Sequence, residues 1–243
     1  MKSFISIPNL PDSKISLAAV GNFPEIISAL HNIGINTVSF ENKNLSEEVC
    51  RHQDMLLCLA DEKHIFLDPA QDKTILESNG FSVEYTSALG NEYPDDVKLN
   101  VAVSEDFYIC NKKTCAKELL NALEATGKKP VYVNQGYTKC SVCFVTENAV
   151  ITEDAGIYSA LTNAGIDVLL ISKGDIYLSD NHYGFFGGST GKLDKDILGV
   201  TGELKYHRNC EQIKEFCTKH KVVIKELTKG RITDIGGILP LKS

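Results

Sequence analysis

The chain has 243 residues with a formal net charge of -7 at pH 7, and 43% of its residues are hydrophobic. That apolar content is enough for a sizeable core. The acidic charge argues against a nucleic-acid-binding surface, which needs clustered Lys and Arg. Pro8 and Pro11 interrupt the N-terminal apolar stretch, and no run approaches the ~20 apolar residues that cross a bilayer. We therefore expect neither a signal sequence nor a membrane span.

The elements predicted along the chain form a repeated plan. Residues 14–41 read as strand, helix and strand. Residues 54–87, 98–134, 140–172 and 196–228 each read as an apolar strand, a tight polar turn, a second strand, a helix and a third strand. These patterns predict five ββαβ units, the first abbreviated, within one domain spanning residues 1–243.

The helices of these units have recognisable ends. A residue suited to the left-handed conformation follows each predicted helix, and a β-branched run comes next: Gly34, Gly80, Gly127, Gly165 and, in the last unit, Lys221. Asp68, Asn111 and Thr152 are expected to act as helix N-caps.

A polar residue ends the third strand of every unit, seven positions after the helix stop. These residues are Glu41, Ser87, Asn134, Ser172 and Thr228. If the units surround a common axis with these strands innermost, the five side chains form a polar ring at one end of an apolar barrel. The alternative is that strands end in polar residues simply because they reach water there.

Eight cysteines are spread through a chain that should fold without disulfides, which indicates a reducing, cytoplasmic setting. Most are expected to be small buried hydrophobic residues. Cys140-Ser-Val-Cys143 has the spacing of half a zinc site, but no second half accompanies it. We expect no metal and no cofactor.

Three stretches carry a resemblance to a known superfamily: "QGYTKCSVCFVTENAVITEDAGIY", "HYGFFGGSTGKL" and "ITDIGGILPL". Together with the fivefold repeat, they resemble the guanidino-group-modifying enzymes of the pentein fold. The likeness is greatest to an uncharacterised bacterial family predicted to have that fold. The resemblance implies an α/β, five-unit pseudo-symmetric ββαβ propeller. Any activity it implies is of a hydrolase or amidinotransferase kind, acting on C–N bonds.

The C-terminal stretch departs from that superfamily. A glycine-rich turn near the C-terminus of those enzymes leads to a cysteine nucleophile, and residues 234–240 resemble this turn. Pro240 stands about where the cysteine is expected, and no cysteine follows Cys217. The usual mechanism therefore cannot be carried over. Gly236 and Gly237 are expected to let the last strand approach its neighbour or a ligand closely.

A long loop between the fourth and fifth units, residues 173–195, is the clearest candidate for ligand binding. The polar residues are Asp180, Asn181, His182 and Tyr183, followed by Gly187 and Gly188. His182 with Asp180 is suited to proton transfer. The alternative is an ordinary surface loop. "GGSTGK" lacks the full spacing of a phosphate-binding loop.

Cys140 is the best candidate for a substitute nucleophile. Lys139 precedes it and is expected to lower its pKa, and Tyr137 is expected nearby. The alternative is an inert, buried cysteine. Asp234 is a further candidate ligand-binding residue.

Two functional hypotheses follow from the sequence. In the first, the protein binds and modifies a small guanidino or amino-acid-like compound in an axial cavity, with Cys140, His182 and Asp180 as catalytic residues. In the second, it is a noncatalytic pentein that binds a macromolecule, as Pro240 favours. No nucleic-acid partner is expected, and the sequence leaves the oligomeric state open.

Overall fold

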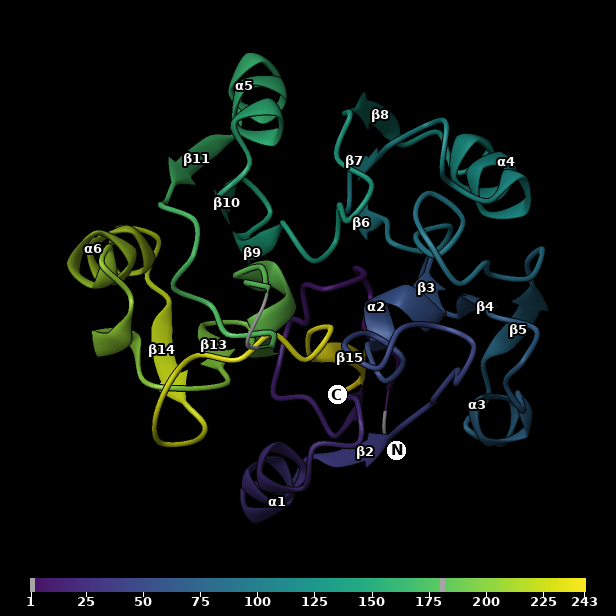
Figure 1. Ribbon diagram of the computed structural model, residues 1–243, viewed down its shortest axis with the longest axis horizontal. Helices are drawn as coiled ribbons and strands as arrows, with labels where there is room; N and C mark the ends of the chain where they lie inside the picture. Colours follow the sequence, from purple (N-terminus) through teal and green to yellow (C-terminus); the bar gives the residue numbers. More distant parts are fainter. Residues whose placement is uncertain (1–2, 180–181) are drawn as a thin grey trace.

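The computed structural model describes residues 3–179 and 182–243 as a mixed α/β fold containing five three-stranded sheets. In every sheet the middle strand pairs antiparallel with one neighbour and parallel with the other. Figure 1 shows the sheets arranged around a common centre, with most of the helices at the periphery.

The strand nearest the centre in each sheet belongs to the antiparallel pair. These inner strands are β3 (Leu57–Leu59), β6 (Ala102–Val103), β9 (Cys143–Thr146), β12 (Thr190–Asp194) and β15 (Leu239–Lys242). The middle strands are β1 (Leu17–Ala19), β4 (His64–Leu67), β7 (Phe107–Cys110), β10 (Ala149–Thr152) and β13 (Ile197–Val200). The outer strands are β2 (Asn36–Val38), β5 (Ser82–Tyr85), β8 (Lys129–Tyr132), β11 (Asp167–Leu170) and β14 (Val223–Glu226).

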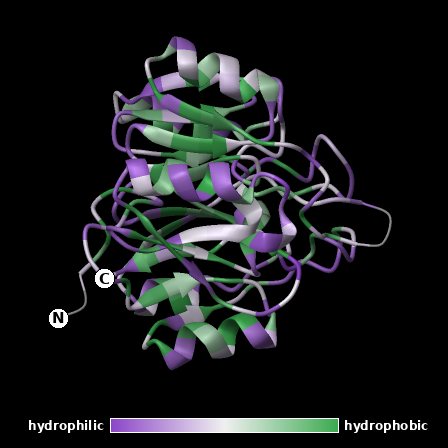
Figure 2. Ribbon diagram, turned by 90° about the vertical axis from the view of Figure 1, so that its left-hand side faces the viewer, coloured by the Kyte–Doolittle hydropathy of each residue, from purple (hydrophilic) through white to green (hydrophobic). Residues whose placement is uncertain are grey.

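Helices connect the middle strands to the outer ones in the parallel pairs. They are α1 (Pro24–Asn32), α3 (Thr74–Ser78), α4 (Lys117–Ala125), α5 (Ala155–Asn163) and α6 (Cys210–Lys219). A short helix, α2 (Gln53–Leu56), precedes β3, and two 3-10 turns, η1 (Gly187–Ser189) and η2 (Leu204–Tyr206), precede β12 and α6. Figure 2 shows hydrophobic residues concentrated on the strands and hydrophilic ones on outward helix faces and loops. Among the described residues, no helix is both long and apolar enough to cross a bilayer.

The predicted helix stops are confirmed. The backbone φ angle is positive at all five positions: Gly34, Gly80, Gly127, Gly165 and Lys221. The predicted N-caps are wrong, because α3, α4 and α5 begin later, after Lys73, Ala116 and Asp154. Of these three, only Asp154 makes a side-chain cap, accepting a hydrogen bond from the Ile157 amide.

The last strand completes the first sheet. β15 pairs antiparallel with β1, with Pro240 opposite Ala18. The first unit therefore lacks its inner strand in the N-terminal part of the sequence, and β15 from the C-terminal part supplies that strand. Ser3 and Ser243 exchange backbone hydrogen bonds of 3.0 Å, so the two ends of the described chain lie side by side. This pairing explains why the chain ends on an apolar run.

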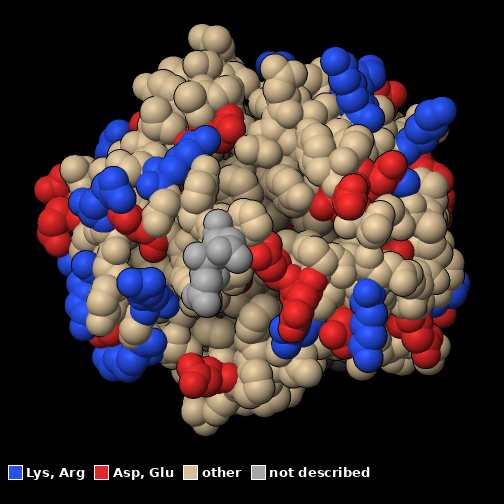
Figure 3. All heavy atoms as spheres, viewed as in Figure 1, with Lys and Arg blue, Asp and Glu red and all other residues tan. Residues whose placement is uncertain are grey.

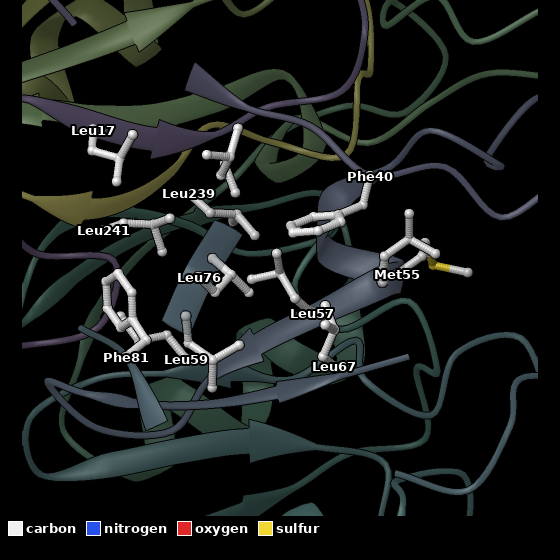
Figure 4. Close-up of a cluster of buried hydrophobic side chains, with 14 of the residues drawn as sticks. Leu17, Phe40, Met55, Leu57, Leu59, Leu67, Leu76, Phe81, Leu239 and Leu241 are labelled. Carbon is white, nitrogen blue, oxygen red and sulfur yellow. The ribbon is translucent and has the colours of Figure 1, made fainter. Parts of the chain in front are cut away.

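The terminal strand also packs into the core. Figure 4 shows Leu239 and Leu241 of β15 in one cluster with Leu57 and Leu59 of β3. Fully burying each of these side chains contributes about 1.5–3 kcal/mol relative to leaving it in water. Leucines of the last strand thus join the first sheet to the second.

The expectation that the third strands lie innermost is wrong. β5, β8 and β14 are mostly exposed, and each outer strand lies at the edge of its sheet. The inner position belongs to the first strand of each hairpin (Figure 1).

Candidate functional site

Polar residues meet just before the inner strands begin, where the five sheets converge. Asp54 precedes β3, Asn100 precedes β6, Cys140 precedes β9, Gly188 precedes β12 and Asp234 precedes β15. Hydrogen bonds join these segments directly. The Asn100 Nδ2 atom lies 3.1 Å from the Asp54 carbonyl oxygen, and the Gly188 amide lies 2.8 Å from the Cys140 carbonyl oxygen.

A cavity of about 310 Å³ opens above this convergence. His52, Cys140 and Asp234 are its most buried polar lining residues, and Glu48 and His182 form its more exposed side. Figure 3 shows this face of the molecule hollowed near its centre, with Asp and Glu side chains along one side of the hollow. The cavity therefore combines a buried polar floor with an acidic approach.

Cys140 is held by two neighbouring segments. Its Sγ atom lies 3.0 Å from Asp54 Oδ2 and 3.1 Å from Asn100 Nδ2, and Asn100 Oδ1 accepts the Cys140 amide at 3.2 Å. Burial raises the pKa of the Cys140 thiol well above its ordinary value, and the Asp54 and Asp234 carboxylates raise it further. The expectation that Lys139 gives Cys140 a lowered pKa is therefore wrong, because the pKa of the thiol is raised. In the free protein the thiol is protonated at neutral pH.

His52 and Asp234 form a second pair in the cavity floor. His52 Nδ1 lies 3.7 Å from Asp234 Oδ1. The Asp234 carboxylate accepts the amides of Phe185 at 2.8 Å and Gly236 at 3.0 Å. Burial raises the pKa of Asp234, partly offset by His52. Within the described part of the chain, His52 Nε2 and Asp54 Oδ1 are buried without a hydrogen-bond partner. Such groups are costly unless a ligand or water pairs with them.

Glycines let backbone segments approach His52 and Asp234 closely, and Gly236 and Gly237 were expected to allow such an approach. Gly236 has φ of +73°, and a Cβ there would lie 2.3 Å from the Cα of His52. A Cβ at Gly188 would lie 2.1 Å from Asp234 Oδ1. The carbonyl of Gly188 accepts the amides of Ile235 and Gly237 at 3.0 and 2.7 Å. Any larger residue would displace the carboxylate or the imidazole.

His182 lies at the cavity's exposed side, with its side chain 66% exposed. Its Nδ1 atom is 3.0 Å from Glu48 Oε1, which also accepts the Ser179 hydroxyl at 2.5 Å. These two hydrogen bonds lower the pKa of Glu48. The expected partner Asp180, with Asn181, lies outside the described residues. The acidic partner in the described structure is Glu48.

Aromatic rings form one wall of the cavity. The Tyr137 ring stacks between Tyr93 and Phe185, with ring centroids 6.0 Å apart in both pairs. The Tyr137 hydroxyl donates to Asp96 Oδ2 at 2.8 Å, which fixes the ring in place. Tyr183 also lines the cavity.

The remaining predicted residues lie elsewhere. Gly187 packs against the backbone of Cys140 and Val142, below the cavity. Lys139 lines a separate, much smaller cavity. The predicted polar ring does not form, because the strand-end residues stand beyond the outer strands and none lines the 310 Å³ cavity: Glu41, Ser87, Asn134, Ser172 and Thr228. They take part in local contacts, such as the hydrogen bond from the Ser172 amide to Asn209 Oδ1.

Sequence reasoning missed His52, Asp54 and Asn100. His52 and Asp54 lie in "EEVCRHQDML", which reads as a charged surface stretch between two units. Their position could have indicated them, because His52, Asp54 and Asn100 each lie just before the first apolar strand of a predicted unit, as Cys140 does. Within residues 3–179 and 182–243, no group of three or more His, Cys, Asp or Glu side chains is arranged to hold a metal ion.

The solved structures similar to this chain share one fold. Agmatine deiminase from C. jejuni has a TM-score of 0.56 at 10% identity, covering 93% of this chain and 89% of that one. Inosamine-phosphate amidinotransferase from Streptomyces griseus has a TM-score of 0.57 at 13% identity, covering 98% and 97%. DDAH from Pseudomonas aeruginosa has a TM-score of 0.53 at 9% identity, covering 95% and 100%. The chain therefore has the fold of the pentein-type guanidino-modifying enzymes, as its sequence resemblance predicted.

Sequence comparisons place the chain more narrowly. No curated protein matched it. One family model matches residues 21–239, which include every described cavity residue discussed above and both glycines of the C-terminal turn. The chain thus belongs to the Family of unknown function (DUF6873).

Proposed function

We propose that the protein binds a small guanidino or amino-acid-like cation in the 310 Å³ cavity of a five-unit pentein propeller. The observation that carries this proposal is that Nε2 of His52, a residue lining the cavity, is buried without a hydrogen-bond partner among the described residues. The same holds for Oδ1 of Asp54, whose Oδ2 contacts the lining residue Cys140. Buried polar atoms of this kind are paired by a ligand or water in most proteins. The volume lies at the lower end of the roughly 300–1,000 Å³ typical of small-molecule sites.

Charge favours a cationic ligand. Glu48 and Asp234 line the cavity, and Asp54 lies directly behind Cys140. A guanidinium group offers several N–H donors in one plane, which suits paired carboxylate oxygens. The stacked rings of Tyr137 and Phe185 add faces on which a planar cation can lie.

The same groups are suited to chemistry at a C–N bond. In this proposal a bound cation lowers the pKa of Cys140, and the thiol proton passes to Asp54 Oδ2, 3.0 Å away. Sγ then forms a bond to the planar carbon, and an amine leaves with a proton from His52. Water or an acceptor amine then attacks the same carbon and gives a proton back to His52. The C–S bond breaks, Sγ recovers its proton from Asp54, and the product is freed. The activity is of a hydrolase or amidinotransferase kind.

Calorimetric titration with agmatine, arginine and citrulline, whose side chain is uncharged, tests the binding. We expect the two cations to bind the wild-type protein and citrulline to bind at least about tenfold more weakly, a difference of about 1.4 kcal/mol. Glu48→Gln removes one charge from the exposed side and should weaken cation binding. Glu105→Gln, on an exposed turn, is the matched control and should change nothing.

Turnover is tested separately by measuring released ammonia or transferred amidino groups, with Cys140→Ser as the inactive variant. Failure of every cation to bind would overturn the proposal. Binding without Cys140-dependent turnover would retain the ligand and reject the chemistry. No cation binding, together with capture of a defined macromolecule, would instead favour the noncatalytic alternative that Pro240 motivated.

A further inference from the structure

A second, much smaller cavity lies on the inner strands, apart from the site described above. It is about 10 Å³, on the order of one water molecule, and is lined by residues of β9, β12 and the segment before β15. Two of its lining residues are lysines, Lys139 and Lys192, and none is acidic. A small polar space bounded by two cations is unusual for a protein interior, where buried charges are normally paired.

Lys139 brings an unpaired ammonium group to this cavity. Only 6% of the residue is exposed, and its Nζ atom has no hydrogen-bond or ion-pair partner among residues 3–179 and 182–243. Its backbone is held in place by Asn100, whose Oδ1 accepts the Lys139 amide at 2.6 Å. A Cβ at Gly237 would lie 3.5 Å from Nζ, so the lysine fills the space that this glycine leaves open.

Lys192 reaches the same cavity from β12. Only 2% of it is exposed, and Nζ donates to the Val145 carbonyl oxygen at 3.1 Å, which leaves two of its three donors unused. Burial lowers its pKa to about 8, so the group is still mostly protonated at pH 7.

The titratable groups around the two lysines do not supply a counter-charge inside the cavity. Burial raises the pKa of the nearby Cys143 thiol to about 11, so it stays neutral. The same holds for Cys217, with a pKa of about 12. Asp194 and Asp196 raise the pKa of Lys192 less than Cys143 and Cys217 do, and neither forms an ion pair with it among the described residues.

We propose that the cavity binds one monoatomic anion, chloride in ordinary buffers, between the ammonium groups of Lys139 and Lys192. The volume is on the order of one water molecule, which favours a monoatomic anion over phosphate, sulfate and carboxylates. The anion accepts from Lys139 Nζ, for which no protein acceptor is found among the described residues, and offsets the repulsion between the two positive charges. Because Asn100 holds the amides of both Lys139 and Cys140, the anion also steadies the turn that carries Cys140.

Thermal unfolding of the full chain at constant ionic strength tests this proposal, with sodium chloride compared with sodium gluconate. At a chloride concentration ten times the dissociation constant, we expect the melting temperature to rise by about 3–6 °C. Lys139→Met should lose this chloride-specific rise. Lys113→Met, which removes an exposed lysine next to a local turn, should keep it. Equal melting temperatures of the wild type in both salts would overturn the proposal.

A crystal soaked in sodium bromide gives a second readout that needs no variant. We expect one anomalous peak inside the cavity, within hydrogen-bond distance of both lysine Nζ atoms. An ordered water, or an empty cavity, in its place would overturn the assignment. Neither experiment involves the larger cavity, so its outcome is independent of the proposed guanidino ligand.

Discussion

Glu153 is a buried acid whose titration should govern the stability of the protein. It follows β10 and sends Oε1 to the Phe186 amide at 2.9 Å. Oε2 is buried without a partner in the described part of the chain. Burial raises the pKa of Glu153 to about 8 from 4.5, and the Asp234 carboxylate adds to the shift. The folded protein therefore holds a proton here that the unfolded chain releases at neutral pH.

The sign of the effect follows from this proton. Below pH 4.5 both states are protonated at Glu153, and the residue has no pH-dependent effect. Between pH 4.5 and pH 8 the unfolded state binds fewer protons, so stability falls as pH rises. With these two values, the loss is below about 1 kcal/mol at pH 5 and reaches about 4 kcal/mol at pH 8.

Glu153→Gln removes the titration while keeping an amide oxygen for the Phe186 N–H. We expect the variant and the wild type to unfold at similar urea concentrations at pH 5. At pH 8 the variant should be more stable by about 3 kcal/mol. Urea unfolding at pH 5, 6, 7 and 8 measures the difference, and subtraction cancels the other titrating groups. Glu105→Gln, on an exposed turn, is the control.

A stability difference between Glu153→Gln and wild type that stays constant from pH 5 to pH 8 would refute this reasoning. It would mean that water or a rearranged side chain solvates Oε2, so that Glu153 ionises normally. A variant that is less stable at every pH would show instead that the carboxylic acid makes a hydrogen bond that an amide cannot replace.

Two further predictions concern the cavity floor. Gly236→Ala should destabilise the protein by more than about 2 kcal/mol, because the new Cβ would overlap His52 in addition to the cost of positive φ. Gly127→Ala has the same positive φ with open space around it, so it should cost only about 1 kcal/mol, and urea unfolding of both separates the two effects. In the ligand-free protein, Cys140 should react with iodoacetamide at pH 7 far more slowly than the half-buried Cys210, as followed by mass spectrometry. Early modification of Cys140 would show that its thiol is not held protonated.

The helix stops were predictable because they rest on local signals. A left-handed residue after each helix is visible in the sequence, and even Lys221 adopts φ of +59° in the position that glycine occupies elsewhere. The C-terminal partner of β1 was not predictable in the same way, because pairing between residues far apart in sequence has no local pattern. An apolar terminal run indicated only that the segment is buried.

The prediction that the third strand of each unit lies innermost was wrong, and the charges on some of those strands could have indicated this. Outer strands such as Ser82–Tyr85 and Val223–Glu226 include charged residues, whereas all four residues of the middle strand Phe107–Cys110 are apolar and buried. A strand with solvent on one side tolerates charge, and one flanked on both edges does not. This contrast separates these outer strands from the middle strand Phe107–Cys110, but it does not identify the inner strands, because β12 carries Lys192 and Asp194.

The convergence expected at the ends of the third strands occurs at the starts of the first strands instead. An outer strand ends at the rim, and the chain then returns to the centre before the next inner strand begins. The residues just before that strand, Asp54, Asn100, Cys140 and Asp234 among them, are therefore the ones that meet. Pro240 lies within β15, opposite Ala18, and so adds no side-chain donor or nucleophile to this cluster. The only thiol at the floor of the cavity within the described chain is Cys140, from a different unit, which is why chemistry in this protein must be tested at that residue.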